Sequence, residues 1–305
     1  DTVNLQAMKA PRKSDGKTNL KTNKACFACT IGCGRVAQMD PDHFSLSERK
    51  NFPTVSGGLE YESGYSLGPM VGVDDIEAAT YANYVCNEQG MDPISFGATL
   101  SAAMELFETG AISQKETGGV NLKFGSAEAL VKMVELTGRG EGFGEELGMG
   151  STRLCEKYGH PEFSMAVKGQ EIPGYDGRAM QGMGLAYATS NRGGCHMRGN
   201  MVGPEVLGLP KMIDRFQVQG KSSFVILHQN GSAAIDALVV CKFTNMGVAD
   251  EYFARVLSAV TGIQYDTGDL HRVGERIWNL ERLYNLRAGF SASDDSLPPR
   301  FLEQP

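Results

Sequence analysis

Three cysteines lie within eight residues near the start of the chain, where Cys26, Cys29 and Cys33 form a Cys-x2-Cys-x3-Cys run. Gly32 and Gly34 flank the third cysteine, and glycine lets backbone amide groups approach a sulfur atom closely. A short loop with several thiolates is typical of a backbone wrapped around an inorganic cluster. The run therefore predicts an iron–sulfur site, which constrains the surrounding fold more than any other feature.

A cubic cluster needs a fourth thiolate from a distant part of the chain. The spacing alone leaves four candidates for it, which are Cys86, Cys155, Cys195 and Cys241. Structural zinc also accepts four thiolates, but it usually draws them from two Cys-x2-Cys pairs, and this sequence has one such pair. Free cysteines are the third interpretation, and the residues alone do not separate the three.

Composition narrows the class of protein. With 41% hydrophobic residues among 305, the chain can bury a substantial core, and its net charge of −7 is well mixed. A basic field for nucleic acid or an anionic membrane is therefore not expected, nor is a membrane span, because no apolar run approaches about 20 residues. The close cysteine triplet fits a reducing cytoplasm, so we expect a cytoplasmic protein that acts on small molecules.

Apolar residues recur at helical spacing, with capping residues such as Asp75 and Ser126 before the runs and Gly90 after the first of them. The β signal is weak and is limited to a short strand over residues 163–167. The pattern therefore predicts a mainly α fold, with helices between Asp75 and Gly90, over about 95–109, from Ser126 onward, and over 143–158, 211–228, 232–240, 250–261 and 268–288.

A change of composition near residues 169–174 predicts the domain organisation. We expect an exposed lead-in over residues 1–24, a helical domain over 25–170 and a second helical domain over 171–305. The chain begins with Asp rather than Met, and its tail shows no closing helix. Both features predict a fragment of a longer polypeptide.

Residues 174–208 are crowded with glycine, methionine and arginine around His196. A surface loop does not need so many small residues beside a histidine and several arginines, whereas a backbone pressed against a large ligand does. His196 lies between Cys195 and Met197 without a helical core period, which favours a functional role over that of a buried structural histidine. This stretch is the second functional candidate.

Five segments in the same order together resemble the aldehyde:ferredoxin oxidoreductase family of tungsten enzymes. They are the cysteine run, GGLEYES at 57–63, GMDPISFG at 90–97, ATSNRGGCH at 188–196 and DALVVCK at 236–242. The resemblance implies the two helical domains of such a subunit, with the N-terminal β-rich cofactor domain absent. It also implies a 4Fe-4S cluster and a bis-pterin cofactor that holds tungsten or molybdenum.

The resemblance assigns the cofactor ligands. In this family the fourth cluster cysteine ends an Asp-x-x-Gly-Leu-Cys type motif that also holds one pterin. Here Asp236 and Cys241 keep that spacing, with Val239 where glycine is usual. Cys241 is thus implied as the fourth ligand, with Asp236 and the adjacent Lys242 on the pterin; Asp236 is otherwise a helix-surface or capping residue.

Three further residues are implied as cofactor ligands. Asp92 is the candidate for the other pterin, although an Asp before Pro93 is also what a helix start prefers. Arg192 and Arg198 are expected on cofactor phosphates, which suit guanidinium groups.

The family also places a glutamate and a histidine beside the metal, and the resemblance carries the histidine to His196. The glutamate is Glu60 or Glu62, with a slight preference for Glu62, and Tyr175 matches a tyrosine near the metal in some members. A carboxylate whose pKa is raised by burial can take a proton from an attacking water or hydrated aldehyde. His196 can donate a hydrogen bond to the aldehyde oxygen.

Three functions remain open at this stage. The first is anaerobic oxidation of an aldehyde to a carboxylic acid, with electron transfer to ferredoxin or another electron-transfer subunit in an oligomeric enzyme. The second is the catalytic subunit of an aryl-CoA reductase of the benzoyl-CoA type, which shares the helical domains. The third is a non-catalytic iron–sulfur electron-transfer module, which requires that the catalytic candidates do not converge.

Overall fold

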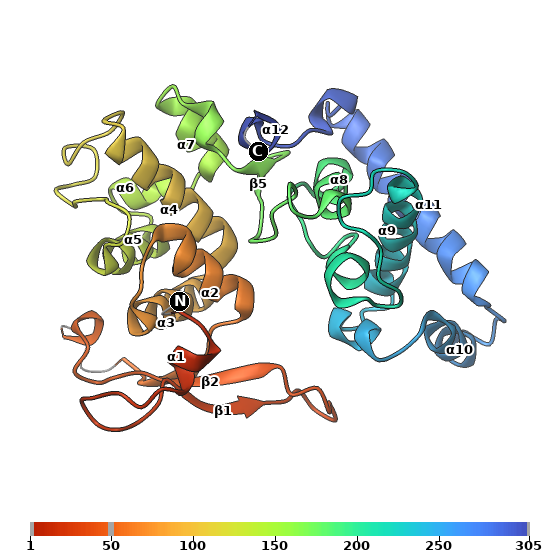
Figure 1. The fold of residues 1–305 in the computed structure, drawn as a ribbon, viewed down its shortest axis with the longest axis horizontal. Coiled ribbons are helices and arrows are strands. Elements are labelled where there is room, and N and C mark those ends of the chain that lie inside the picture. The colour runs from red at the N-terminus through yellow and green to blue at the C-terminus, as the bar shows by residue number, and fades with distance from the viewer. Residues whose placement is uncertain (1–2, 48–51, 304–305) are drawn as a thin grey trace. The chain divides into compact units, whose positions relative to one another are not determined.

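The computed structural model describes residues 3–47 and 52–303, and the chain divides into two compact units, Asp1–Met165 and Ala166–Pro305 (Figure 1). Helices dominate both units, so the mainly α fold is confirmed. The predicted domain boundary after residue 170 stays a prediction. No helix in the described ranges is both long and apolar enough to cross a membrane.

The core of the first unit forms among α3 (Ile76–Gln89), α4 (Pro93–Glu108) and α5 (Ala127–Arg139). The Asp75 side chain caps α3 by accepting the amide hydrogens of Glu77 and Ala78, and Gly90 ends it at φ +70°. Ser126 caps α5 as expected. Completely buried side chains fill the space between these helices, including Tyr81, Leu100, Met104, Leu130 and Met133.

The helix expected over residues 143–158 is two helices, α6 (Phe143–Leu147) and α7 (Ser151–Lys157). Gly150 adopts φ +85° between them, a conformation that glycine reaches easily and that an α-helix cannot contain. The short helices α1 (Leu5–Lys9) and α2 (Tyr61–Leu67) complete the α-helices described in this unit.

A three-stranded antiparallel sheet carries the cysteine run. Strand β1 (Leu20–Lys24) pairs with β2 (Gly34–Gln38), which pairs with β3 (Val55–Gly57), so the three cysteines lie on the loop that joins β1 to β2. A Cβ atom at Gly34 would lie 2.8 Å from the Lys24 carbonyl oxygen, so glycine permits this pairing. The segment expected as a lead-in therefore contains α1 and β1.

The second unit packs α8 (Gln181–Thr189), α9 (Lys221–Ala237), α10 (Asp250–Thr261) and α11 (Thr267–Arg287) together. Residues 211–220, which were expected to be helical, form turns and irregular structure before α9. The two helices expected over 211–228 and 232–240 are replaced by the single helix α9, which continues through Gly231. Helices α9 and α11 pack so closely that Gly274 of α11 must be a glycine, because a Cβ atom there would overlap the Asn230 carbonyl of α9. Figure 1 shows α9 and α11 side by side.

The remaining elements of the second unit are short. A two-stranded hairpin, β4 (Ala166–Val167) and β5 (Gln170–Glu171), stands where one strand over 163–167 was expected. Helix α12 (Pro299–Glu303) lies in the tail, where no helix was expected. The unit also contains the 3-10 helices η5 (Lys242–Met246) and η6 (Ala292–Asp294) and the π-helical η4 (Gly203–Leu207). The corresponding 3-10 helices of the first unit are η1 (Phe44–Leu46), η2 (Pro69–Val71) and η3 (Pro161–Phe163).

Candidate cofactor-binding site

Three of the predicted cofactor ligands, Asp236, Arg198 and Lys242, lie in contact in the second unit. Asp236 lies in the last turn of α9, where the helix dipole disfavours a negative charge. Two cations compensate, since Lys242 Nζ lies 3.0 Å from Asp236 Oδ1 and Arg198 Nη1 lies 3.4 Å from Oδ2. Burial lowers the pKa of Lys242, and the hydrogen bond to Asp236 opposes that shift.

Arg198 is held from a second side by α11. Its Nη2 atom donates to Glu281 Oε2 at 2.5 Å, and its guanidinium carbon lies 5.6 Å from the centre of the Trp278 ring. Only 6% of the residue is exposed, and its buried Nε–H finds no acceptor among the described residues. A buried donor without an acceptor is costly, so this atom suits an anionic or carbonyl group of a bound ligand.

The catalytic candidates of this unit also lie together. The rings of Tyr175 and His196 have centroids 5.7 Å apart and planes inclined by 54°. Cys195, next to His196, is buried. The pair therefore presents a phenol and an imidazole at one place, which can donate or accept a proton there.

Gly193 and Gly194, in the loop that contains His196, pack against other parts of the protein. The glycines of residues 174–208 were expected to approach a ligand instead. Gly193 adopts φ +93°, and a Cβ atom there would overlap the Val167 carbonyl of β4. At Gly194 the Gln170 carbonyl of β5 stands equally close. The loop is thus pressed onto the β4–β5 hairpin, which explains both glycines without a ligand.

Arg192 lies in a different setting from Arg198. It is exposed and borders a hollow of about 310 Å³ that α11 lines on one side. The other residues around this hollow are Asn191, Leu280, Glu281, Tyr284 and Asn285. A role for Arg192 on a cofactor phosphate stays a prediction.

The proposed fourth cluster cysteine follows a strained residue. Val239 adopts φ +57°, the left-handed region that a β-branched residue avoids at a cost of roughly 1–2 kcal/mol. Glycine meets this backbone requirement without strain, which gives a physical reason for glycine at the matching position of the family motif. Cys241, two residues later, is exposed at the start of η5.

The cysteine run of the first unit offers suitable donors in an open arrangement. Cys26 and Cys33 are exposed and Cys29 is half-buried, and Ala28 and Gly32 adopt φ values of +56° and +59°. Thiolates on such a turn fit an iron–sulfur cluster chemically. Within residues 3–47 and 52–303, no three His, Cys, Asp or Glu side chains are arranged to hold a metal ion.

The two glutamate candidates differ in burial. Glu60 precedes α2, its side chain is 47% exposed, and it lies 3.5 Å from Arg35 Nη1. Glu62, in the first turn of α2, is only 6% exposed. A shielded carboxylate is the better candidate for a proton acceptor in a closed site, which supports the preference for Glu62.

Asp92 caps α4, as one of its two interpretations expected. Its Oδ1 atom accepts the Ile94 amide hydrogen at 2.9 Å, and Pro93 occupies the first helical position. The residue is exposed, so its other carboxylate oxygen can still accept from a ligand. The pterin role of Asp92 stays a prediction.

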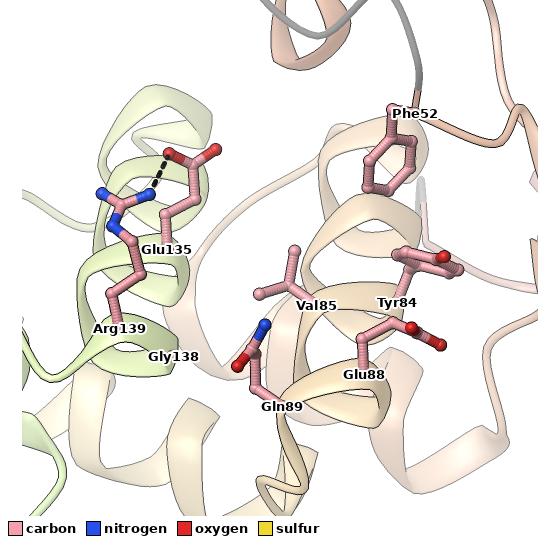
Figure 2. Close-up of a pocket in the computed structure, with 8 residues that line it drawn as sticks. All are labelled: Phe52, Tyr84, Val85, Glu88, Gln89, Glu135, Gly138 and Arg139. Atoms are coloured by element: carbon pink, nitrogen blue, oxygen red, sulfur yellow. Dashed lines mark ion pairs between the residues drawn. The ribbon is translucent and has the colours of Figure 1, made fainter.

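A second hollow, also of about 310 Å³, opens in the first unit between α3 and α5 (Figure 2). The ion pair between Glu135 and Arg139, at 3.8 Å, borders it. None of the predicted site residues lines this hollow, whose other residues are Phe52, Tyr84, Val85, Glu88, Gln89 and Gly138.

Sequence reasoning missed the residues that support the site from a distance. Glu281 and Trp278 hold Arg198, and Asn285 donates to the Asn191 carbonyl at 2.7 Å. All three lie on α11, whose pattern predicts only an amphipathic helix. No local motif marks them, because their partners are far away in the sequence.

The fold and these ligand groups point to an oxidoreductase, and comparison with known proteins identifies its family. Residues 2–305 match the family model described as aldehyde ferredoxin oxidoreductase, domains 2 and 3. The chain therefore belongs to the aldehyde ferredoxin oxidoreductase family, and the resemblance drawn from the five sequence motifs is confirmed.

Two curated relatives are tungsten-containing aldehyde ferredoxin oxidoreductases. That of Pyrococcus furiosus is 45% identical over 291 residues, and that of Pyrococcus horikoshii is 44% identical over 291 residues. Each alignment covers 94% of this chain and 46% of the relative. The chain thus spans about half the length of the curated relatives that it matches.

Two further matches are more distant, one in sequence and one in structure. An aliphatic sulfonate oxidoreductase, WOR-like subunit, of Pyrococcus furiosus is 25% identical over 306 residues, covering 95% of this chain and 44% of the relative. The solved active site complex BamBC of benzoyl coenzyme A reductase, bound to 1,5-dienoyl-CoA, superposes with a TM-score of 0.72 at 15% identity. That match covers 93% of this chain and 47% of the other.

Proposed function

We propose that this chain is the cluster-bearing and cofactor-lining part of a tungsten or molybdenum bis-pterin oxidoreductase that oxidises an aldehyde to a carboxylic acid. Electrons leave to ferredoxin or another electron-transfer subunit, in a cytoplasmic, oligomeric enzyme. The observation that carries the proposal is Asp236, held by Arg198 and Lys242 five residues before Cys241. This arrangement joins a pterin acceptor to a cluster thiolate on one short segment.

The chain's own residues supply complementary groups for the cofactors. The carboxylate of Asp236 accepts from pterin N–H groups, while Arg198, Arg192 and Lys242 donate to phosphate or carbonyl oxygens. Asp92 accepts from the other pterin. When bound, the metal–pterin group would supply two-electron redox chemistry, and the cluster thiolates are Cys26, Cys29, Cys33 and Cys241.

The catalytic residues move protons and orient the substrate. Glu62, or Glu60 in its place, takes the proton from an attacking water or hydrated aldehyde. His196 donates a hydrogen bond to the aldehyde oxygen, where negative charge develops, and Tyr175 orients the imidazole by the ring contact described above.

Aldehyde oxidation is favoured over aryl-CoA reduction by sequence identity. The likeness to the benzoyl coenzyme A reductase subunit, at 15% identity, concerns the fold alone. The relatives with 44–45% identity are named for aldehydes and ferredoxin. Assays of aldehyde oxidation with ferredoxin and of aryl-CoA reduction separate the two activities.

The first experiment is a metal and cofactor analysis of the full-length subunit, purified without oxygen. We expect four irons, one tungsten or molybdenum and two pterins per chain. Iron without heavy metal or pterin would reduce the protein to an electron carrier, and zinc alone would contradict both interpretations. A Cys241→Ser variant should lose the cluster iron, whereas Cys86→Ser, which alters a buried thiol, should retain it.

A further inference from the structure

The loop of residues 191–198 is bound to helix α11 at both ends of the loop, through Asn191 and Arg198. At one end, Asn191 Nδ2 donates to the Trp278 carbonyl at 2.9 Å, and Asn285 Nδ2 donates to the Asn191 carbonyl at 2.7 Å. At the other end, Arg198 donates to Glu281. His196 lies between these two attachments, so its backbone is anchored to a single stretch of α11.

Glu281 balances the charge of Arg198 against Asp236. The guanidinium lies between two carboxylates, with Nη2 at 2.5 Å from Glu281 and Nη1 at the longer distance of 3.4 Å from Asp236. The shorter contact draws Arg198 toward α11. Lys242 Nζ holds Oδ1 of Asp236 at 3.0 Å, whereas Oδ2 has only the long contact to Arg198 and so retains acceptor capacity for a ligand.

We propose that Glu281 is a positioning residue that holds Arg198 against α11 and so keeps Asp236 available to the pterin cofactor. The inference rests on the proposed function. Without the carboxylate of Glu281, the buried guanidinium would pair closely with Asp236, its other carboxylate partner. That pair would occupy Oδ2, the oxygen that Lys242 leaves to the cofactor, and would redirect the Nε–H of Arg198, which has no acceptor among the described residues.

The test replaces Glu281 in the full-length subunit and measures tungsten, pterin and iron per chain. Glu281→Gln preserves the shape of the side chain and removes its charge. Because a charge-assisted contact is lost, we expect the variant to bind the tungsten–pterin cofactor about tenfold more weakly and to contain less tungsten and pterin per chain. Iron should remain at the wild-type level. A general folding defect would instead lower iron and tungsten together, and that result would overturn the positioning role.

Two further variants keep the test decisive. Glu275→Gln changes an exposed glutamate of the same helix and should leave all three contents unchanged. In an Arg198→Gln background, Glu281→Gln should cause no additional loss of tungsten, because Glu281 acts through Arg198. Additive losses would overturn the inference.

The same measurements distinguish a failure of the proposed function from a failure of the role of Glu281. A wild-type subunit without tungsten, molybdenum or pterin would overturn the proposed function and the inference together. A fully loaded wild type with an equally loaded Glu281→Gln variant would overturn the inference alone.

Discussion

His271 Nε2 lies 2.8 Å from Asp250 Oδ2, which joins α11 to the first residue of α10. The hydrogen bond to Asp250 raises the pKa of His271, and the hydrogen bond to His271 lowers the pKa of Asp250. His228, whose pKa is lowered by burial, lies in the field of both groups. At mildly acidic to neutral pH the pair is therefore charged, and it holds α10 against α11.

This pair should make stability depend on pH. A histidine with a raised pKa contributes most below its ordinary value near 6.5 and loses that contribution as the pH rises through the folded-state value. The free-energy difference between wild type and His271→Gln should therefore be larger at pH 5.5 than at pH 9. Chemical denaturation at both values measures it, and a difference that grows with pH would contradict the assignment.

Relief of backbone strain at Val239 should stabilise the second unit. Val239→Gly removes a β-branched residue from φ +57°, at some cost from the greater flexibility of the unfolded chain, for a net gain of about 0.5–1 kcal/mol. The free energy of unfolding measures the gain. Val248→Gly, at an exposed valine whose φ is not positive, should be destabilising, and equal effects would refute the argument.

The buried ion pair of Lys221 and Glu205 should be costly to break. Lys221 Nζ lies 2.6 Å from Glu205 Oε1, and Glu205 also accepts the amide hydrogens of Gly182 and Met183 at the start of α8. Lys221→Met leaves a buried carboxylate unpaired and should destabilise by about 3–5 kcal/mol. Denaturant unfolding measures the loss.

Two variants check that interpretation. Lys211→Met, at an exposed lysine, should change the free energy of unfolding by less than about 0.5 kcal/mol. Adding Glu205→Gln to Lys221→Met should recover part of the loss, because the buried charge is gone. No recovery would show that the lost packing, rather than the charge, dominates.

Thiol reactivity should separate ligand cysteines from core cysteines. Burial raises the pKa of Cys86 to about 12, so this thiol carries almost no reactive thiolate at pH 8. In metal-free protein, iodoacetamide should modify the exposed Cys26, Cys33 and Cys241 and spare Cys86. Peptide mass spectrometry reads the pattern, and early labelling of Cys86 would contradict it.

Local signals predicted much of the helical architecture. Asp75, Asp92 and Ser126 each cap a helix through their own side chains, so their neighbours in sequence are sufficient to reveal them. Strand β1 escaped prediction because its side chains are mostly exposed and its order comes from pairing with β2. The gap expected at residues 229–231, between two helices, lies inside the continuous α9, because helix propensity is a weak signal that tertiary packing overrides.

The candidate site also contains residues that the sequence indicated and residues that it did not. The motif around Asp236 and Cys241 was found because its members are adjacent in sequence. Its contact with Arg198 joins the motif to a residue outside all five segments, and the support that Glu281 gives to Arg198 joins positions 83 residues apart. Such support follows from the packing of α8, α9 and α11, which single-sequence patterns do not encode.

The attachment of residues 191–198 to α11 bears on how this polypeptide can be divided. Asn191 and Arg198 find their partners 83 to 94 positions downstream. A truncated product that stops before Thr267 would keep every residue of the ATSNRGGCH segment and lose the helix that shapes it. A recombinant fragment meant to preserve this loop must therefore extend through Arg287, and a motif match in a shorter fragment says little about its geometry.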